Sequence, residues 1–254
     1  MWRWLVVCGG FVGALAFASC GGPTSATDAG ALDAGAPDAG PGCVRDGGLL
    51  LRYNQDWADF LRTGCTSITG QLSIAAGLVV LSPPATALTA VGGLYVADNA
   101  TLTSLSLPAL TTVSENVRVS SNTALTSLEL PALTTVGGGL LVQYNTALTS
   151  LHLPALQTCG GLAASTPLDV HGNAALTSLS LPALTTASGG LAIATNATLA
   201  DLGLPALVTL RGSLSVTDNT MLRQCLVDAI KLRITTGPFI YTSSGNNGMP
   251  NTCP

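Results

Sequence analysis

The stretch Leu125-Thr-Ser-Leu-Glu-Leu-Pro-Ala-Leu-Thr-Thr-Val-Gly-Gly-Gly-Leu-Leu-Val-Gln-Tyr-Asn145 decides the fold, because close copies of it return along the chain. Its two Leu-x-Leu-like segments, Leu128 to Leu130 and Leu140 to Val142, place alternate side chains on one side of a short strand. No single copy can bury its leucines alone, so the copies must stack. The sequence predicts an all-β, right-handed parallel β-solenoid of about six 23-residue leucine-rich coils.

The asparagine that ends each copy marks the period. It recurs at steps of 23, 23, 28, 23 and 23 residues, at Asn99, Asn122, Asn145, Asn173, Asn196 and Asn219. We interpret these residues as a structural ladder at an inner corner, whose amides bond backbone groups that the turn leaves unpaired.

Both ends of such a stack need caps, and the flanking sequences supply helical patterns. The N-terminal cap is expected over residues 43–65, with a helix that Asn54 caps, that carries Trp57, Phe60 and Leu61, and that Gly64 ends. The C-terminal cap is expected over residues 222–254, with a second helix carrying Leu222, Leu226 and Ile230. The sequence therefore predicts one solenoid domain over residues 43–254.

Five cysteines lie in this domain, and four of them flank the repeats. In an oxidising compartment we expect disulfides that close the caps, with Cys43 and Cys65 around the first helix and Cys225 and Cys253 around the last segment. Cys159 instead occupies the core column of Val113, Val136, Ala187 and Leu210. It is interpreted as a buried thiol that packs as a small apolar side chain.

The N-terminus carries an export signal, predicted over residues 1–19. Arg3 precedes an uncharged apolar run from Leu5 to Phe17, which is too short to span a membrane. Phe17-Ala-Ser-Cys20 resembles a bacterial lipobox, although that motif usually has Leu where this chain has Phe17. The resemblance implies lipidation of Cys20, and the alternative is an ordinary signal peptide that happens to contain a cysteine.

Residues 20–42 are expected to form a flexible tether between the lipid and the solenoid. The triplet Asp-Ala-Gly repeats at Asp28, Asp33 and Asp38, and nothing in the segment can form a core. Gly21 stands where lipoproteins retained in the inner membrane often have Asp, so we expect an exported protein that its lipid anchors in the outer membrane of the bacterial envelope.

The solenoid resembles a receptor L domain, the fold of the ligand-binding lobes of insulin- and EGF-receptor ectodomains. The resemblance covers residues 43–254 and rests on Gly64-Cys65-Thr-Ser-Ile-Thr-Gly-Gln-Leu-Ser-Ile74, on the coils G-x-L-x-V-x-x-N-x-x-L-x-x-L-x-L, and on Leu222-x-x-Cys225 with Cys253. In that family these cysteines close the caps. The chain has no cysteine-rich module or kinase segment, so signalling is not implied. A rival resemblance is the BspA-type leucine-rich repeat, which shares L-T-S-L-x-L-P but usually has cysteine where this chain has asparagine.

Composition disfavours several functions. The chain of 254 residues has a net charge of -4 and 9% charged residues, so it offers no basic stripe for nucleic acid. Glu129 and His152 occupy the same outward position on successive coils, but a chance solvated pair is favoured over an acid and base pair. His152, Cys159, Asp169 and His171 fall in one irregular coil, but Cys159 points inward, which disfavours a metal site. We therefore expect no catalytic residues and no cofactor.

The sharpest binding prediction concerns the only loop that breaks the period, where five extra residues enlarge the segment from Gly160 to Pro167. A neutral insertion is the alternative. The candidate ligand surface around it consists of Arg118, Glu129, Leu141, Tyr144, His152, Gly160, Gly161, Ser165, Thr166 and Asp169.

The expected function is therefore a non-catalytic envelope protein that binds a protein or glycan ligand. The scarcity of aromatic residues favours a protein. A passive envelope component is the alternative, and a polysaccharide-active enzyme ranks lower. Ice binding is also disfavoured, because the column of Thr103, Thr126, Thr149 and Thr177 has serines rather than a second threonine row beside it.

Overall fold

The computed structural model describes residues 43–52, 54–75, 80–81, 88–160, 167–237 and 239–249, which all fall within one compact unit, Gly35–Pro254. Several predictions lie outside the described residues: the signal peptide 1–19, the tether 20–42, lipidation at Cys20, and the residues Cys253, Gly161, Ser165 and Thr166.

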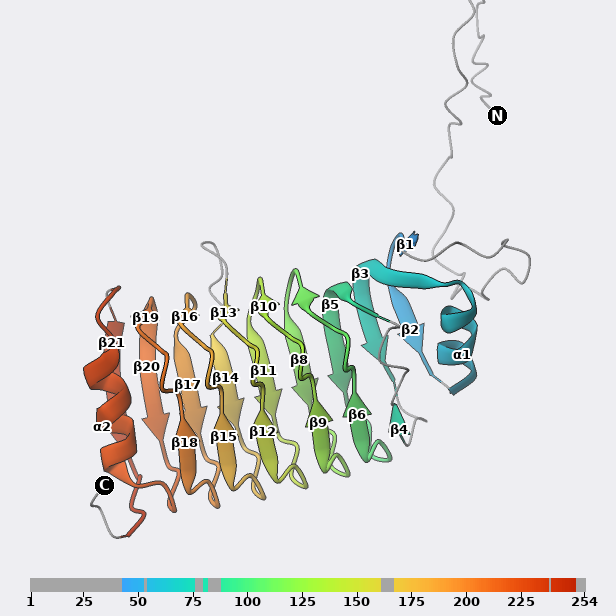
Figure 1. Ribbon diagram of the computed structural model, residues 1–254. Helices are drawn as coiled ribbons and strands as arrows, with labels where there is room; N and C mark the ends of the chain where they lie inside the picture. The colour runs from blue at the N-terminus through green and yellow to red at the C-terminus, as the bar shows by residue number, and fades with distance from the viewer. Residues whose placement is uncertain are drawn as a thin grey trace, which may run out of the picture. The chain divides into compact units, whose positions relative to one another are not determined.

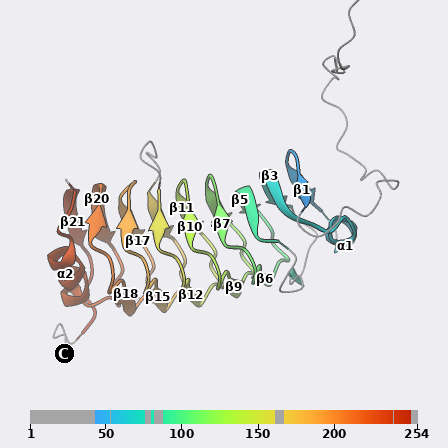
Figure 2. The ribbon, with the colours of Figure 1, turned by 45° about the horizontal axis from the view of Figure 1, so that its top comes forward.

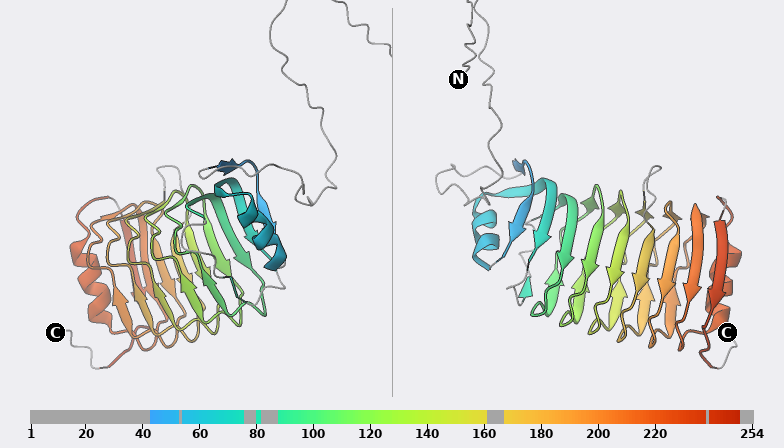
Figure 3. Two further views of the ribbon diagram at one scale, coloured as in Figure 1. Left: turned by 45° about the vertical axis from the view of Figure 1, so that its right-hand side comes forward. Right: turned by 180° about the vertical axis from the view of Figure 1, so that it is seen from behind.

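The described chain is an all-β parallel solenoid, in which a typical coil contributes three short strands (Figure 1). The first face has the longest strands. They are β2 (Leu49–Leu51), β3 (Cys65–Ile74), β5 (Ala90–Ala97), β8 (Val117–Ser120), β11 (Leu140–Gln143), β14 (Leu168–His171), β17 (Leu191–Ala194), β20 (Gly212–Thr217) and β21 (Phe239–Ser244). They pair in this order, and Figure 3 shows them following one another along the stack.

Two further faces complete each coil. The second face is formed by β1 (Cys43–Arg45), the first halves of β3 and β5, β7 (Thr112–Val113), β10 (Thr135–Val136), β13 (Thr158–Cys159), β16 (Thr186–Ala187) and β19 (Thr209–Leu210). The third face is formed by β4 (Val80–Leu81), β6 (Ser104–Ser106), β9 (Ser127–Glu129), β12 (Ser150–His152), β15 (Ser178–Ser180) and β18 (Asp201–Gly203). Figure 2 shows the second and third faces from another angle.

The core is the continuous interior predicted from the leucine columns. In the coil that follows Asn122, the side chains of Leu125, Leu130, Leu133 and Leu140 are fully buried. Each inward residue of a strand stacks on its counterpart in the next coil, as Val142 does on Val170. Because the strands alternate inward and outward residues, the leucine repeat alone fixes which side chains build the core.

The solenoid has about eight turns, two more than the repeat predicts. The additional turns lie at the two ends, where the chain coils in the same parallel register without the Leu-x-Leu-Pro pattern. In particular, β21 was not predicted and extends the first face beyond β20.

The asparagines form a buried ladder along one corner. Asn122 illustrates the pattern, because its backbone N–H and its Nδ2 both donate to Oδ1 of Asn145, at 3.1 and 3.0 Å. Its Nδ2 also donates to the carbonyl of Val96 at 3.0 Å. The ladder continues past Asn219 to Asn246, which accepts two hydrogen bonds from Asn219. Each amide therefore joins two coils and satisfies backbone groups at the corner.

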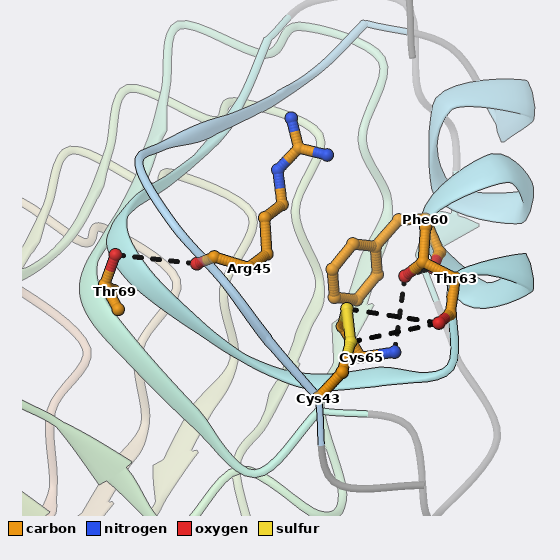
Figure 4. Close-up of a disulfide and its surroundings, with 6 residues drawn as sticks. All are labelled: Cys43, Arg45, Phe60, Thr63, Cys65 and Thr69. Carbon is orange, nitrogen blue, oxygen red and sulfur yellow. Dashed lines mark hydrogen bonds between the residues drawn. A yellow bond between two sulfur atoms is a disulfide. The ribbon is translucent and has the colours of Figure 1, made fainter. Parts of the chain in front are cut away.

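A helix lies at each end of the stack (Figure 1). Helix α1 (Asn54–Arg62) buries Trp57 and Phe60, and the side chain of Asn54 is not among those described. The Cys43–Cys65 disulfide joins β1 to β3 beside Phe60 (Figure 4).

Helix α2 (Gln224–Arg233) buries Val227 and Ile230. Leu222, just before this helix, is also buried, and Leu226 packs partly buried against the core. Cys225 is disulfide-bonded, and its expected partner, Cys253, lies outside the described residues. No helix in the described part of the chain is both long and apolar enough to cross a membrane.

Candidate functional site

The larger outward side chains of the first face gather over the four neighbouring strands β5, β8, β11 and β14. One outward row consists of Tyr95, Arg118, the apolar Leu141 and Asp169, and each is in register with the next. Farther along the same row the outward residues become small, with Ala192 after Asp169 and then Ser215.

Arg118 is held in place at one end of this row. Its guanidinium carbon lies 5.5 Å from the centre of the Tyr95 ring, within the range of a cation–π contact. Its Nε donates to the hydroxyl of Ser120 at 3.0 Å. Both Arg118 and Tyr95 are exposed, so the pair presents a fixed cation and an aromatic ring to solvent.

Asp169 and His171 form a pair at the other end. His171 Nδ1 lies 2.9 Å from Asp169 Oδ1, while Nε2 of Gln143 donates to Asp169 Oδ2 at 2.7 Å. The Asp169 and His171 side chains are 18% and 25% exposed, so both are held by neighbours and still reach solvent. Both carboxylate oxygens of Asp169 thus have a partner, which fixes the His171 ring.

Tyr144 completes the cluster from the adjacent corner. Its ring meets the His171 ring edge to face, with the ring centres 4.6 Å apart, and its side chain is 54% exposed. Tyr144 itself has a φ of 56°. At the equivalent corner of the next coil stands Gly172, where an added Cβ would lie 2.6 Å from the Tyr144 ring. A glycine at that position therefore makes room for Tyr144 to lie against His171.

We call this set of side chains the first-face patch; it consists of Tyr95, Arg118, Leu141, Gln143, Tyr144, Asp169 and His171. It combines two tyrosines and an arginine, the residue types enriched in binding hot spots, around the partly buried Leu141. Because the patch stands on paired strands, its groups keep a fixed geometry before any ligand arrives.

The structure divides the ligand surface that the sequence predicts. Arg118, Leu141, Tyr144 and Asp169 lie together in the first-face patch. Glu129 and His152 lie on the third face, at the ends of β9 and β12, so they belong to another surface.

The predicted loop contributes little to the described site. Gly160, at its start, has a φ of 89°, and residues 161–166 are not described.

Sequence reasoning did not include Tyr95, Gln143 and His171 in the candidate surface. His171 had a visible signal, because it follows Asp169 by two residues on a strand and therefore points to the same side. Gln143 stands next to His171 in register, which becomes visible only once the coils are aligned across the 28-residue step.

The chemistry available to the described residues is limited. Cys159 is free and buried on β13, and burial raises the pKa of its thiol to about 12, so the thiol is protonated at neutral pH. No three His, Cys, Asp or Glu side chains in the described part of the chain lie together in a way that suits a metal ion.

The second face carries two rows of threonine side chains, distinct from the column of Thr103, Thr126, Thr149 and Thr177. One row is in register through five strands, at Thr112, Thr135, Thr158, Thr186 and Thr209. In the row beside it, the hydroxyls of Thr111, Thr134 and Thr185 each donate to a carbonyl of the preceding coil, at 2.9, 2.9 and 3.1 Å. These bonds fix the side chains of the second row.

Comparison of the chain with family models, with curated proteins and with solved structures found no match. The relation to receptor L domains and the rival relation to BspA-type repeats therefore stay predictions from the residues.

Proposed function

We propose that this protein is a lipid-anchored component of the bacterial cell envelope that binds a protein partner through the first-face patch. The observation that carries the proposal is the contrast along the first face. Tyrosine, arginine, aspartate and histidine side chains gather over β5 to β14, whereas alanine, serine and threonine occupy the same rows on β17 and β20.

The arrangement of the patch suits a protein surface. Arg118 and Asp169 are each one coil from Leu141, so the opposite charges stand roughly 10 Å apart with an apolar side chain between them. The opposite charges of Arg118 and Asp169 would orient a partner. An apolar residue surrounded by polar ones, as Leu141 is here, is a common arrangement at binding hot spots. A glycan is the alternative ligand, and a passive envelope role is the alternative function.

The membrane half of the proposal rests on residues 1–42 alone. The apolar run, Cys20 and the Asp-Ala-Gly tether support export and lipidation. Metabolic labelling with a fatty acid tests this half separately, because a Cys20→Ser variant should lose the label and the membrane association.

Saturable binding to fractionated envelope proteins tests the recognition half. We expect Arg118→Ala and Tyr144→Ala each to weaken binding by about tenfold or more, as hot-spot residues do. Thr217→Ala, on the same face beyond the patch, is the matched control and should bind as the unsubstituted chain does. If no envelope protein binds any of these proteins, the passive role is favoured; binding that survives both substitutions would place the interface elsewhere.

Ice binding is a second candidate function, favoured by the threonine rows of the second face. Their side chains repeat at about 4.8 Å, the spacing of paired strands, and form a regular array of hydroxyl and methyl groups. Such an array is suited to order the water beside it. Thermal hysteresis measures this activity; Thr158→Tyr should abolish it and Arg118→Ala should not. An unsubstituted chain without thermal hysteresis would remove this candidate.

A further inference from the structure

The third face is divided into two sheets. The strands β4, β6 and β9 form one three-stranded sheet, and β12, β15 and β18 form another. The first and second faces are continuous across the same two coils, because β11 pairs with both β8 and β14, and β10 pairs with both β7 and β13. The strand pairing between these two coils is therefore interrupted on the third face alone.

The hydrogen bonds missing at this boundary are those that other coils make. In the described structure, Leu130 N–H does not bond the carbonyl of His152, and Thr149 N–H does not bond the carbonyl of Thr126. The equivalents of the first bond are Leu107 to Glu129 at 2.9 Å, Leu153 to Ser180 at 3.2 Å and Leu181 to Gly203 at 2.9 Å. The equivalents of the second are Thr126 to Thr103 at 2.9 Å, Thr177 to Thr149 at 2.9 Å and Ala200 to Thr177 at 3.0 Å.

A cleft of about 250 Å³ lies at this boundary. Its outward lining consists of three facing pairs, one member from each coil: Ser127 and Ser150, Glu129 and His152, Pro131 and Pro154. The cleft reaches down to Leu128 and Leu130 of the core.

The cleft coincides with a change in the outward side chains of this face. Ser106, Ser180 and Gly203 continue the row of Glu129 and His152 on the neighbouring coils. Among the described residues of this row, a carboxylate and an imidazole therefore occur only on the two coils that border the cleft. The Ser127 hydroxyl donates to Oε1 of Glu129 at 3.1 Å, which holds the carboxylate at the rim.

We propose that this cleft binds one neutral sugar residue. Its polar groups both donate and accept: the N–H of Leu130 makes no backbone hydrogen bond in the described structure and can donate, while the Glu129 carboxylate and the His152 carbonyl can accept. Sugar hydroxyls also do both, so one ligand satisfies groups that a purely donating or accepting ligand would leave unpaired.

Size and charge narrow the ligand further. Pockets for drug-sized ligands start at about 300 Å³, so a cleft of about 250 Å³ suits a single ring. The lining has a carboxylate and no lysine or arginine, which disfavours acidic sugars. The rings of Pro131 and Pro154 offer apolar surface to the C–H groups of a sugar. With no aromatic platform, we expect a dissociation constant in about the millimolar range.

The site is separate from the first-face patch, because it lies on the third face and shares no residue with it. An experiment that contradicts sugar binding in the cleft therefore does not contradict protein binding by the first-face patch, and the reverse also holds. The chain has two histidines, His152 in the cleft and His171 in the patch, so each reports on one site.

Amide hydrogen exchange on the full chain tests whether the cleft is open. We expect the Leu130 and Thr149 amides to exchange at least about tenfold faster than the Leu107 and Leu153 amides, which are hydrogen-bonded. Equal protection at all four positions would mean that the sheets are joined, and would overturn the proposal.

Titration with methyl glycosides of glucose, galactose, mannose and N-acetylglucosamine tests the ligand, with the ring signals of the two histidines followed by NMR. We expect at least one neutral glycoside to move the His152 signals and leave those of His171 unchanged. Methyl β-D-glucuronide, which adds a carboxylate to the glucoside, should bind at least about tenfold more weakly than the glucoside. No movement of His152 at the solubility limit of all four neutral glycosides would overturn the proposal, as would movement of His171 alone.

Glu129→Ser and His152→Ser give each position the residue that the neighbouring coils carry, so both variants should fold. We expect Glu129→Ser to weaken binding of the best glycoside about tenfold, because a hydrogen bond to a charged group is lost. Saturation-transfer NMR on the sugar measures both variants. Asp201→Ser, on the same face but outside the cleft, is the matched control. Unchanged binding in both cleft variants would overturn the proposal.

Discussion

Replacing Asn145 with leucine tests whether the asparagine ladder stabilises the solenoid. Leucine branches at Cγ as asparagine does and is somewhat larger, so the substitution removes hydrogen bonds without opening a cavity. Asn145 Oδ1 accepts from the N–H and from Nδ2 of Asn122, at 3.1 and 3.0 Å, and its own Nδ2 donates to the carbonyl of Val119 at 2.9 Å. The substitution therefore leaves the buried N–H of Asn122 without its partner. It also removes one of the two hydrogen bonds that Asn122 Nδ2 donates, since the bond to Val96 remains, and one that the Val119 carbonyl accepts.

The expected loss follows from that count. A buried group left unpaired costs about 1 to 3 kcal/mol and a lost hydrogen bond about 1 kcal/mol, so one unpaired N–H and two lost bonds lower the free energy of unfolding by about 3 kcal/mol or more. Asn99, at the start of the ladder, is the matched control. Among the described residues its Oδ1 accepts no hydrogen bond, and its Nδ2 donates to the carbonyls of Ile74 and Ala97. Asn99→Leu orphans no backbone N–H, so we expect a loss of only about 1 to 2 kcal/mol.

Chemical unfolding followed by circular dichroism measures both losses. We expect Asn145→Leu to lower the free energy of unfolding more than Asn99→Leu does, and this difference tests the ladder as much as either loss alone. Equal destabilisation by Asn145→Leu and Asn99→Leu, or none by either, would show that the ladder's hydrogen bonds are not what holds the corner together.

Three further predictions concern single positions. Gly172→Ala should displace the Tyr144 ring and cost about 1 to 2 kcal/mol, because residue 172 has a φ of 69° and the new Cβ would meet that ring; an unchanged His171 ring shift by NMR would contradict this. Cys159 should stay unlabelled by a thiol reagent at pH 8 until the protein unfolds, because its raised pKa of about 12 keeps the thiol protonated; peptide mapping that finds labelled Cys159 in folded protein would refute it. Replacing both Cys43 and Cys65 with serine should lower the free energy of unfolding by about 3 kcal/mol, given their separation of 22 residues; the urea midpoint checks it, and an unshifted midpoint would count against it.

The repeat made the body of the fold predictable, because the leucine positions decide which side chains face inward. Leu125, Leu130 and Leu140 are buried as their period requires. The outer turns could not be found in this way. Strand β21 lacks the pattern, and only its backbone pairing with β20 makes it part of the stack. A solenoid can add such turns because each coil needs only a neighbour with a matching strand edge.

The candidate sites were less predictable than the fold. Tyr144 was a candidate from its sequence position, but its contact with His171 depends on the missing Cβ of Gly172 in the next coil. The parting of β9 from β12 has no sequence signal of its own, because Leu128-x-Leu130 and Leu151-x-Leu153 have the same pattern as coils that stay joined. The repeat pattern within one coil predicts its strands. The Tyr144–His171 contact and the interrupted pairing of β9 with β12 depend instead on how two neighbouring coils meet.

The departures from the repeat are concentrated in the middle of the stack. Glu129, Tyr144, His152, Asp169 and His171 all lie within two successive coils, and most of the corresponding outward positions elsewhere carry serine, threonine, alanine or glycine. Stacking requires none of these five side chains, since the coils beside them form the same ladders without them. Because interactions in a solenoid reach only the neighbouring coil, the ends need capping residues, but nothing in the stacking calls for special residues at the centre. Stacking therefore does not account for this central group of polar and aromatic side chains, which agrees with the two binding sites that we propose.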